Sequence, residues 1–145
     1  MTQTKRIQVE KTVNVPISMV WEAWNSPDDI TQWNAADPSW HCPASENDLR
    51  AGGHFKHRME AKDGTAGFDF KGQYDSVEPM REITYTMEDG RQATTTFTPQ
   101  NNSTHILTSF DAETENDPEF QKQGWQSILN NFARYAELKS KTTKD

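Results

Sequence analysis

Residues 52–64, GGHFKHRMEAKDG, contain the pattern that decides the fold. Alternate side chains place Phe55, His57 and Met59 on one face of a strand and mostly charged residues on the other face. The Asp-Gly pair at the end of this stretch is typical of a tight turn between antiparallel strands. The stretch therefore predicts one strand of an antiparallel sheet, with a buried face that carries a histidine.

Similar runs of strand type follow, and turn pairs such as Asp89-Gly90 and Asn101-Asn102 separate them. Residues 6–15 alternate in the same way ahead of Pro16. Six antiparallel strands are therefore expected, at about residues 6–15, 53–62, 67–77, 82–88, 91–98 and 104–111. The residues expected on the dry face of the two central strands are Phe68, Phe70, Gly72, Tyr74, Ile83, Tyr85 and Met87.

Helical spacing of apolar residues predicts two short helices between residues 17 and 33. Ser26 is expected to cap the second of them, with Pro27 at the first helical position and Asp29 in a capping box. Residues 34–48 have two prolines and no period, and they are interpreted as a lid-like loop that hides Trp40.

A long amphipathic helix is expected at residues 118–138, where Trp125, Leu129 and Phe132 belong to one apolar stripe. One dry sheet face and one long helix to cover it indicate an α+β fold with a curved sheet. The length of 145 residues favours a single domain over residues 1–145, with an ordered core at about residues 6–139.

The net charge of -7 disfavours nucleic acid and membrane surfaces as partners, because both are anionic. Cys42 is the only cysteine and cannot form an internal disulfide, so a cytoplasmic location is expected. No apolar run approaches the roughly 18 residues that a membrane-spanning helix needs. We also expect a monomer or weak dimer.

Five stretches in this order resemble the activator of Hsp90 ATPase homologue 1-like family, in the START-like (SRPBCC) superfamily. The stretches are VPISMVWEAWNSPDDITQW (15–33), GGHF (52–55), GQYDSVEPMREITYT (72–86), TTTFTP (94–99) and GWQSILNNFARY (124–135). The resemblance implies a helix-grip fold, in which the long helix lies across the sheet and leaves a cavity between them. In the wider superfamily this cavity holds lipids, polyketides, plant hormones and other largely apolar molecules, and a stress-related role is implied. The resemblance further implies that Gly124 allows a close approach at the start of the long helix.

The predicted function is therefore to bind a small apolar ligand, aromatic, lipid-like or polyketide-like, between the sheet and the long helix. His57 and Tyr85 are expected to orient this ligand as isolated polar groups in an apolar wall. Trp40 and Cys42 are expected in the lid. The other ligand-binding residues are expected to be Phe55, Met59, Phe70, Met87, Phe97, Trp125, Leu129 and Phe132.

Other interpretations of these residues remain open. His57 could instead bond a neighbour such as Tyr85 or a buried water, and the aromatic side chains could fill the cavity themselves. A cyclase or dehydratase would use His57 as general base, in the same cavity. A third possibility is a module that contacts a chaperone. Hsp90 activation itself is not expected, because no N-terminal activator domain precedes the first strand.

No metal or other cofactor is expected. The side chains of softer ligand type are His41, Cys42, His54, His57 and His105. His54 and His57 are separated by an odd number of positions and therefore point to opposite faces of a strand. His41 and Cys42 by themselves do not make a chelating pair.

Overall fold

The described part of the chain, residues 6–114 and 116–143 of a computed structural model, forms a seven-stranded antiparallel sheet with three helices. The strand order is β1-β7-β6-β5-β4-β3-β2. The elements are β1 (Arg6–Val13), α1 (Ile17–Asn25), α2 (Pro27–Trp33), β2 (Trp40–Asn47), β3 (His54–Ala61), β4 (Gly67–Glu78), β5 (Glu82–Met87), β6 (Gln92–Gln100), β7 (Ser103–Asp111) and α3 (Pro118–Thr143).

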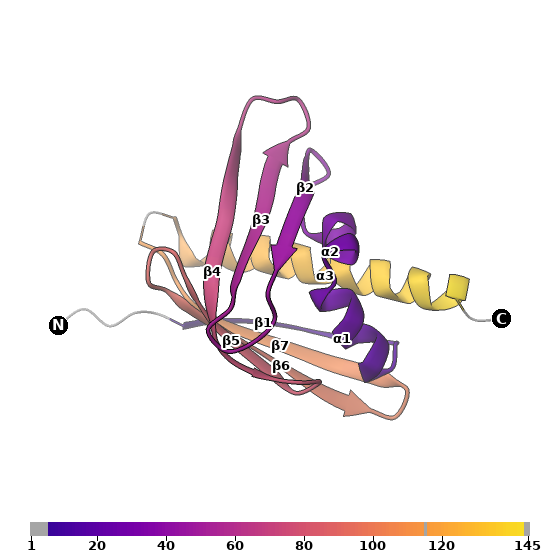
Figure 1. The fold of residues 1–145 in the computed structure, drawn as a ribbon. Helices are drawn as coiled ribbons and strands as arrows, with labels where there is room; N and C mark the ends of the chain where they lie inside the picture. The colour runs from indigo at the N-terminus through magenta and orange to yellow at the C-terminus, as the bar shows by residue number, and fades with distance from the viewer. Residues whose placement is uncertain (1–5, 115, 144–145) are drawn as a thin grey trace.

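The sheet is strongly curled (Figure 1). Strands β2, β3 and β4 rise away from the layer formed by β1, β5, β6 and β7, and α3 runs across the concave side. Helix α3 packs against β1, α1 and α2, and not closely against β3 or β4. This arrangement confirms the predicted α+β helix-grip fold.

The expected strand count of six is wrong, because residues 40–47 form the additional strand β2. It pairs with β3 through Trp40 opposite Ala61 and Ser45 opposite His57, and its register shifts between His41 and Ala44. Proline lacks a backbone N–H, so a strand that contains Pro43 is tolerated at a sheet edge and beside a bulge. The expected lid loop is therefore largely an edge strand.

The predicted face of β4 is correct from Phe68 to Tyr74, because Phe68 stands opposite Met59 and Gly72 opposite Phe55, but this face is not dry at Phe68. Tyr74 is buried, Phe70 is half-buried, and Phe68 is 51% exposed at the far end of the strand. Phe68 contacts Trp40 instead, with ring centroids 6.1 Å apart. The end of β4 that carries Phe68 thus extends beyond the part of the sheet that the helices cover.

Gly72 lies directly opposite Phe55 in the β3–β4 pair. A Cβ atom at position 72 would lie 2.6 Å from Cζ of Phe55 and 2.7 Å from the carbonyl oxygen of Thr86. The Phe55 ring therefore fills the space that a side chain at position 72 would need. At Gly124, by contrast, no heavy atom lies within 4 Å of the corresponding Cβ position, so the close approach expected there is wrong.

The start of α2 differs from the expected capping box. Ser26 is the N-cap residue but makes no side-chain capping bond, and Pro27 occupies the first turn. The Asp29 carboxylate is buried and accepts hydrogen bonds from the Tyr135 hydroxyl and, at 2.6 Å, from Nζ of Lys139. Asp29 therefore joins α2 to α3, because a buried carboxylate needs partners that compensate its lost hydration.

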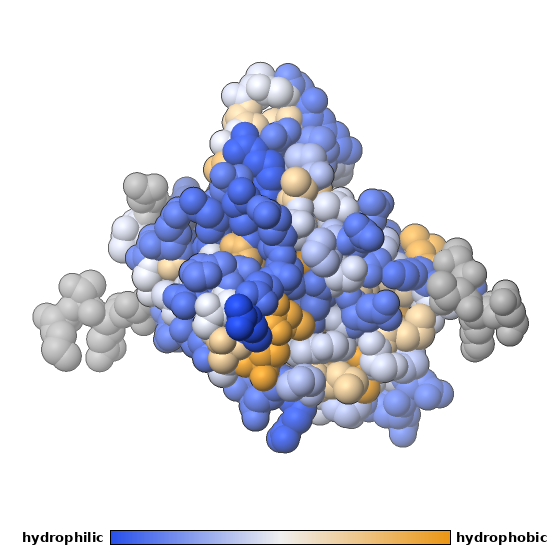
Figure 2. All heavy atoms as spheres, in the orientation of Figure 1, coloured by the Kyte–Doolittle hydropathy of each residue, from blue (hydrophilic) through white to orange (hydrophobic). Residues whose placement is uncertain are grey.

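Hydrophilic side chains cover most of the face drawn in Figure 2, and its apolar patches are small. The apolar stripe of α3 is turned inward, with Leu129, Phe132 and Ala136 buried. Ile106 and Phe110 of β7 are fully buried, whereas Leu107, which points to the other face of the same strand, is only partly buried. The buried apolar residues form two clusters, a larger one that includes Ile106 and Phe132 and a smaller one that includes Phe110.

Gly72→Ala should destabilise the protein by about 1–3 kcal/mol, because the new methyl group overlaps Phe55 and the Thr86 carbonyl. Gly124→Ala is the matched control and should be neutral or stabilise the helix by up to about 1 kcal/mol. Urea unfolding of both variants measures the difference. Equal stability of the two variants would contradict the close contact at Gly72.

Asp29→Asn should lower the free energy of unfolding by about 1–3 kcal/mol, because the charge-assisted bonds to Lys139 and Tyr135 are weakened. Asp28→Asn removes the same charge from the exposed neighbouring position and should cost less than about 1 kcal/mol. Thermal or urea unfolding gives both values. If Asp28→Asn were the more damaging change, Asp29 would not be the link between the two helices.

Candidate functional site

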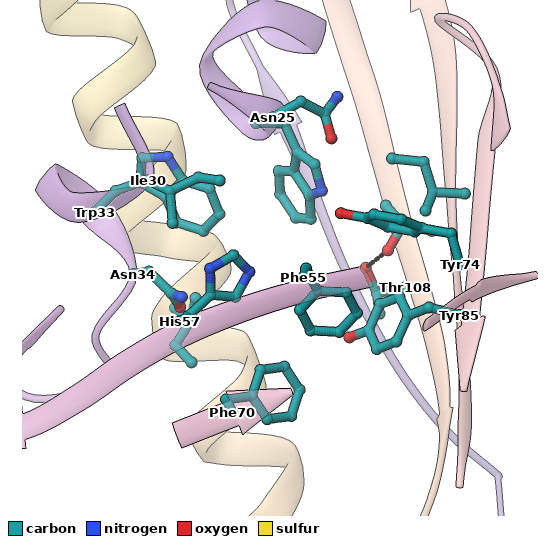
Figure 3. Close-up of a pocket in the computed structure, with 14 residues that line it drawn as sticks. Asn25, Ile30, Trp33, Asn34, Phe55, His57, Phe70, Tyr74, Tyr85 and Thr108 are labelled. Atoms are coloured by element: carbon teal, nitrogen blue, oxygen red, sulfur yellow. Dashed lines mark hydrogen bonds between the residues drawn. The ribbon is translucent and has the colours of Figure 1, made fainter. Parts of the chain in front are cut away.

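A cavity of about 110 Å³ lies between the curled sheet, α1, α2 and α3 (Figure 3). Four of the residues predicted to bind ligand line it: Phe55, His57, Phe70 and Tyr85. The remaining lining residues are Trp24, Asn25, Ile30, Trp33, Asn34, Tyr74, Ile83, Thr95, Thr108 and Ile128. The wall is therefore mainly aromatic and aliphatic, with a few amide and hydroxyl groups.

His57 lies on the inner face of β3, as the alternation predicted. Its Nδ1 is 2.9 Å from Oγ of Ser45, which stands opposite it on β2. Its ring is nearly parallel to that of Phe55, with centroids 5.2 Å apart and planes inclined by 25°. Burial lowers the pKa of His57 to about 4, because the charged imidazolium would lose its hydration. The ring is therefore neutral at neutral pH.

The alternative that His57 bonds a neighbour is thus confirmed for one of its two nitrogens, with Ser45 in place of the expected Tyr85. Nε2 makes no hydrogen bond with any other described residue. Figure 3 shows the imidazole between Asn34 and Phe55 at one end of the cavity. One ring nitrogen is therefore held by the protein, and the other remains able to bond a guest molecule.

Tyr85 projects from β5 at the opposite end of the cavity (Figure 3). Its ring packs edge-on against Phe55, with centroids 4.9 Å apart and an interplanar angle of 78°. Burial raises the pKa of its phenol, so the group stays protonated and can donate a hydrogen bond. No described residue accepts that bond, which leaves the hydroxyl as a second polar group without a protein partner.

Several other polar groups around the cavity are hydrogen-bonded within the protein. The Tyr74 hydroxyl donates to Oδ1 of Asn47 at 2.5 Å, and Nδ2 of Asn47 donates to the Asn25 carbonyl oxygen at 2.7 Å. The hydroxyls of Thr95 and Thr108 are 2.9 Å apart. These hydrogen bonds hold the side chains of the wall in place. The Tyr85 hydroxyl and Nε2 of His57 differ from them, because neither bonds another described residue.

Sequence reasoning missed the part of the wall that the two short helices provide. Trp24 and Trp33 lie with ring centroids 5.1 Å apart, and Nε1 of Trp33 donates to the Ala23 carbonyl oxygen at 3.0 Å. Trp24 falls at helical spacing from Ile17, Val20 and Trp21 in the sequence, and this apolar stripe was the available signal. It could not show that this stripe faces a cavity instead of close-packed side chains.

Several predicted ligand-binding residues are instead packed in the core. Phe97 and Phe132 make edge-on contacts with Trp24, at centroid distances of 5.6 and 4.9 Å. Met59 and Leu129 are buried in the same cluster and do not line the cavity. The interpretation that aromatic side chains fill much of the space is therefore correct for this part of the interior.

Trp125 and Met87 also lie away from the cavity lining, in a second apolar cluster with Ile7, Ala93 and Phe110. Trp125 stacks on Phe110, with ring centroids 3.9 Å apart and planes inclined by 9°. Its role in the structure is to attach the beginning of α3 to β7.

Trp40 and Cys42 do not form a lid. Both belong to β2, and they line an outer groove between α2 and α3. Cys42 is only 2% exposed, its thiol donates to the Ala44 carbonyl oxygen at 3.4 Å, and burial raises its pKa. A raised pKa keeps the thiol protonated, so Cys42 lacks the thiolate that a nucleophile needs.

The histidines outside the cavity are scattered. His54 is exposed on the outer face, His105 contacts Glu10 at 3.2 Å, and His41 lies 3.9 Å from Glu60. Among the described residues, no three His, Cys, Asp or Glu side chains gather closely enough to hold a metal ion. None of the described helices is long and apolar enough to span a membrane.

Residues 14–137 match the family described as activator of Hsp90 ATPase homolog 1-like protein. The chain belongs to this family. The match includes both short helices and most of α3, together with all strands but β1. The family lies within the START-like superfamily, in agreement with the curled sheet and its crossing helix.

Solved structures with high sequence identity support the assignment. The AHSA1-like protein from Aeromonas hydrophila is 44% identical, with 94% of each chain covered and a TM-score of 0.89. A protein from Cytophaga hutchinsonii is 47% identical over 94% of each chain, with a TM-score of 0.80. A protein from Chromobacterium violaceum is 24% identical, covers 92% of this chain and 98% of its own, and shares the fold with a TM-score of 0.82. No curated protein matches the sequence.

The low pKa of His57 makes a prediction about stability. The pKa is about 4 in the folded protein against 6.5 for a free imidazole, so between these values only the unfolded chain takes up the proton. Stability should be fully present above about pH 6.5 and fall toward pH 4, with His57 contributing about 3 kcal/mol of the loss.

Urea unfolding between pH 4.5 and 7 measures this loss, and His57→Gln is the reference that cannot titrate there. As the pH falls, the free energy of unfolding of the original protein should decrease more than that of His57→Gln. A difference that stays constant with pH would show that burial does not hold His57 in its neutral form.

Proposed function

We propose that the protein binds a small, largely apolar aromatic molecule in the cavity between the sheet and α3. The proposal rests on one observation. The aromatic wall carries two polar groups, the Tyr85 hydroxyl and Nε2 of His57, and neither has a hydrogen-bond partner among the described residues. Polar groups in an apolar enclosure are stabilised when a partner supplies hydrogen bonds. An apolar pocket with a few convergent polar groups is the usual composition of a ligand site.

The wall favours a neutral, flat ligand. Its described residues include no Lys, Arg, Asp or Glu, and His57 is uncharged at neutral pH. The His57 ring is nearly parallel to both Phe55 and Phe70, at interplanar angles of 25° and 27°. A planar ring can stack on these surfaces while its acceptor atoms receive hydrogen bonds from Tyr85.

The size of the cavity limits the guest. A volume of about 110 Å³ is below the roughly 300–1,000 Å³ of sites for drug-sized molecules and near the roughly 150 Å³ of a cavity that binds benzene. In this form the cavity therefore fits one small ring. Lipid-like or polyketide-like ligands require α1 and α2 to move outward with Trp24 and Trp33.

Binding is favoured over catalysis by the pKa of His57. A general base works best when its pKa lies near the operating pH, and a pKa of about 4 makes this imidazole a weak base at neutral pH. The cyclase or dehydratase alternative therefore gains no support from the cavity. A contact with a chaperone stays a prediction from the family resemblance. We place the proposed function in the cytoplasm, without nucleic-acid or membrane partners.

Titration of labelled protein followed by NMR tests the proposal, with phenol and acetophenone as one-ring probes and a flavone and a fatty acid as larger ones. One-ring probes should cause saturable shifts of the Trp24 and Trp33 indoles and of the His57 ring. The Trp125 indole lies outside the cavity and serves as the internal control. Larger probes should also shift amides throughout α1 and α2.

Tyr85→Phe keeps the ring and removes only the hydroxyl, so it should weaken the binding of the favoured probe about two- to tenfold. Circular dichroism should show an unchanged fold, because the hydroxyl has no protein partner to lose. The proposal fails if no probe causes saturable shifts at Trp24 and Trp33, or if Tyr85→Phe binds every probe as well as the original protein.

A further inference from the structure

A second recess, here called the Trp40 groove, lies on the outer side of α2. It is about 390 Å³ in volume and is lined by the end of α2 and the following turn, by the beginning of β2, and by one face of α3. Trp33 and Asn34 line both this groove and the inner cavity, so they form the wall between the two. We propose that the Trp40 groove binds an aromatic carboxylate, as a site separate from the inner cavity.

The charge of the groove favours an anion. Lys62, just after β3, and Arg134, on α3, are both exposed and line the groove. Neither makes an ion pair with any described residue, although the chain has 22 acidic side chains and a net charge of -7. A carboxylate in the groove would be attracted by both cations, and a guanidinium can bind a carboxylate through two parallel hydrogen bonds.

The other ionisable groups of the groove leave this preference in place. Asp37 is the acidic lining residue, and its Oδ1 accepts hydrogen bonds from the backbone N–H and the hydroxyl of Ser39, at 2.8 Å each. His41 lies 3.9 Å from Glu60, and the Tyr135 hydroxyl is engaged with Asp29. The groove thus has two cations, Lys62 and Arg134, and one carboxylate, Asp37, which already accepts hydrogen bonds from Ser39.

The apolar part of the groove favours a ring. Trp40 is half-buried, Leu138 is 57% exposed, and the buried Trp33 lines the groove with them. A flat guest would cover these surfaces and remove them from water. The volume of about 390 Å³ lies within the range of roughly 300–1,000 Å³ for small-molecule sites, which suits a molecule of two fused rings.

Titration with 2-naphthoate tests the proposal, with 2-naphthalenemethanol as the neutral probe of the same shape. The carboxylate should shift the Trp40 indole saturably, and its affinity should fall as salt is raised, because exposed charges are screened. Lys62→Gln and Arg134→Gln should each weaken the affinity about two- to fivefold, and the double variant more. Lys122→Gln removes a charge from an exposed site elsewhere on α3 and should leave binding unchanged.

Three results would overturn the proposal. The neutral alcohol could bind as tightly as the carboxylate, the double variant could bind 2-naphthoate as well as the original protein, or the shifts could fall on Trp24 while Trp40 stays unchanged. The last result would assign the probe to the inner cavity. Because both cations are exposed, their replacement should leave the fold intact, and circular dichroism confirms this for each variant.

Discussion

The contact between the Phe55 ring and Gly72 is the constraint on which the site depends. Phe55 is 4% exposed, and its ring lies over the position where the opposite strand has no side chain. From there it reaches His57, Phe70, Tyr74 and Tyr85, with ring centroids between 4.9 and 5.7 Å away. One missing side chain thus allows one ring to organise most of the aromatic wall of the cavity. A curled sheet needs such a close approach between strands, and glycine allows it.

Hydrogen bonding divides the polar groups of the interior into two kinds. Tyr74, Asn47 and the Thr95–Thr108 pair use their groups within the protein and thereby fix the position of the wall. The Tyr85 hydroxyl has no such partner, and His57 uses only one of its nitrogens. Both residues are only partly buried, and no fully buried side-chain N or O atom of the described residues lacks a partner, so these two groups are open to water in the cavity. A bound molecule can replace that water by supplying the same hydrogen bonds.

Asp29 has a comparable role between the helices. A carboxylate in the interior requires donors, and Tyr135 and Lys139 supply them from α3. The link holds α2 beside α3, where Trp33 separates the inner cavity from the Trp40 groove. Any opening of the cavity that moves α2 must therefore disturb these bonds, which connects the stability of the helix pair to the size of ligand that can enter.

The sequence by itself determined the sheet and the helices, because alternation, turn pairs and helical stripes are local properties of the chain. The same alternation placed Phe55, His57, Phe70 and Tyr85 on the face that lines the cavity. Edge strand β2 was missed, because a strand with Pro43 and no β-branched residues forms only when β3 is there to pair with it. The tertiary structure alone decided that Trp24 and Trp33 face the cavity whereas Phe97 and Phe132 close-pack behind them. The angle between the helices and the curled sheet determines how closely their large side chains can pack. This angle cannot be predicted from the local spacing of residues along the chain.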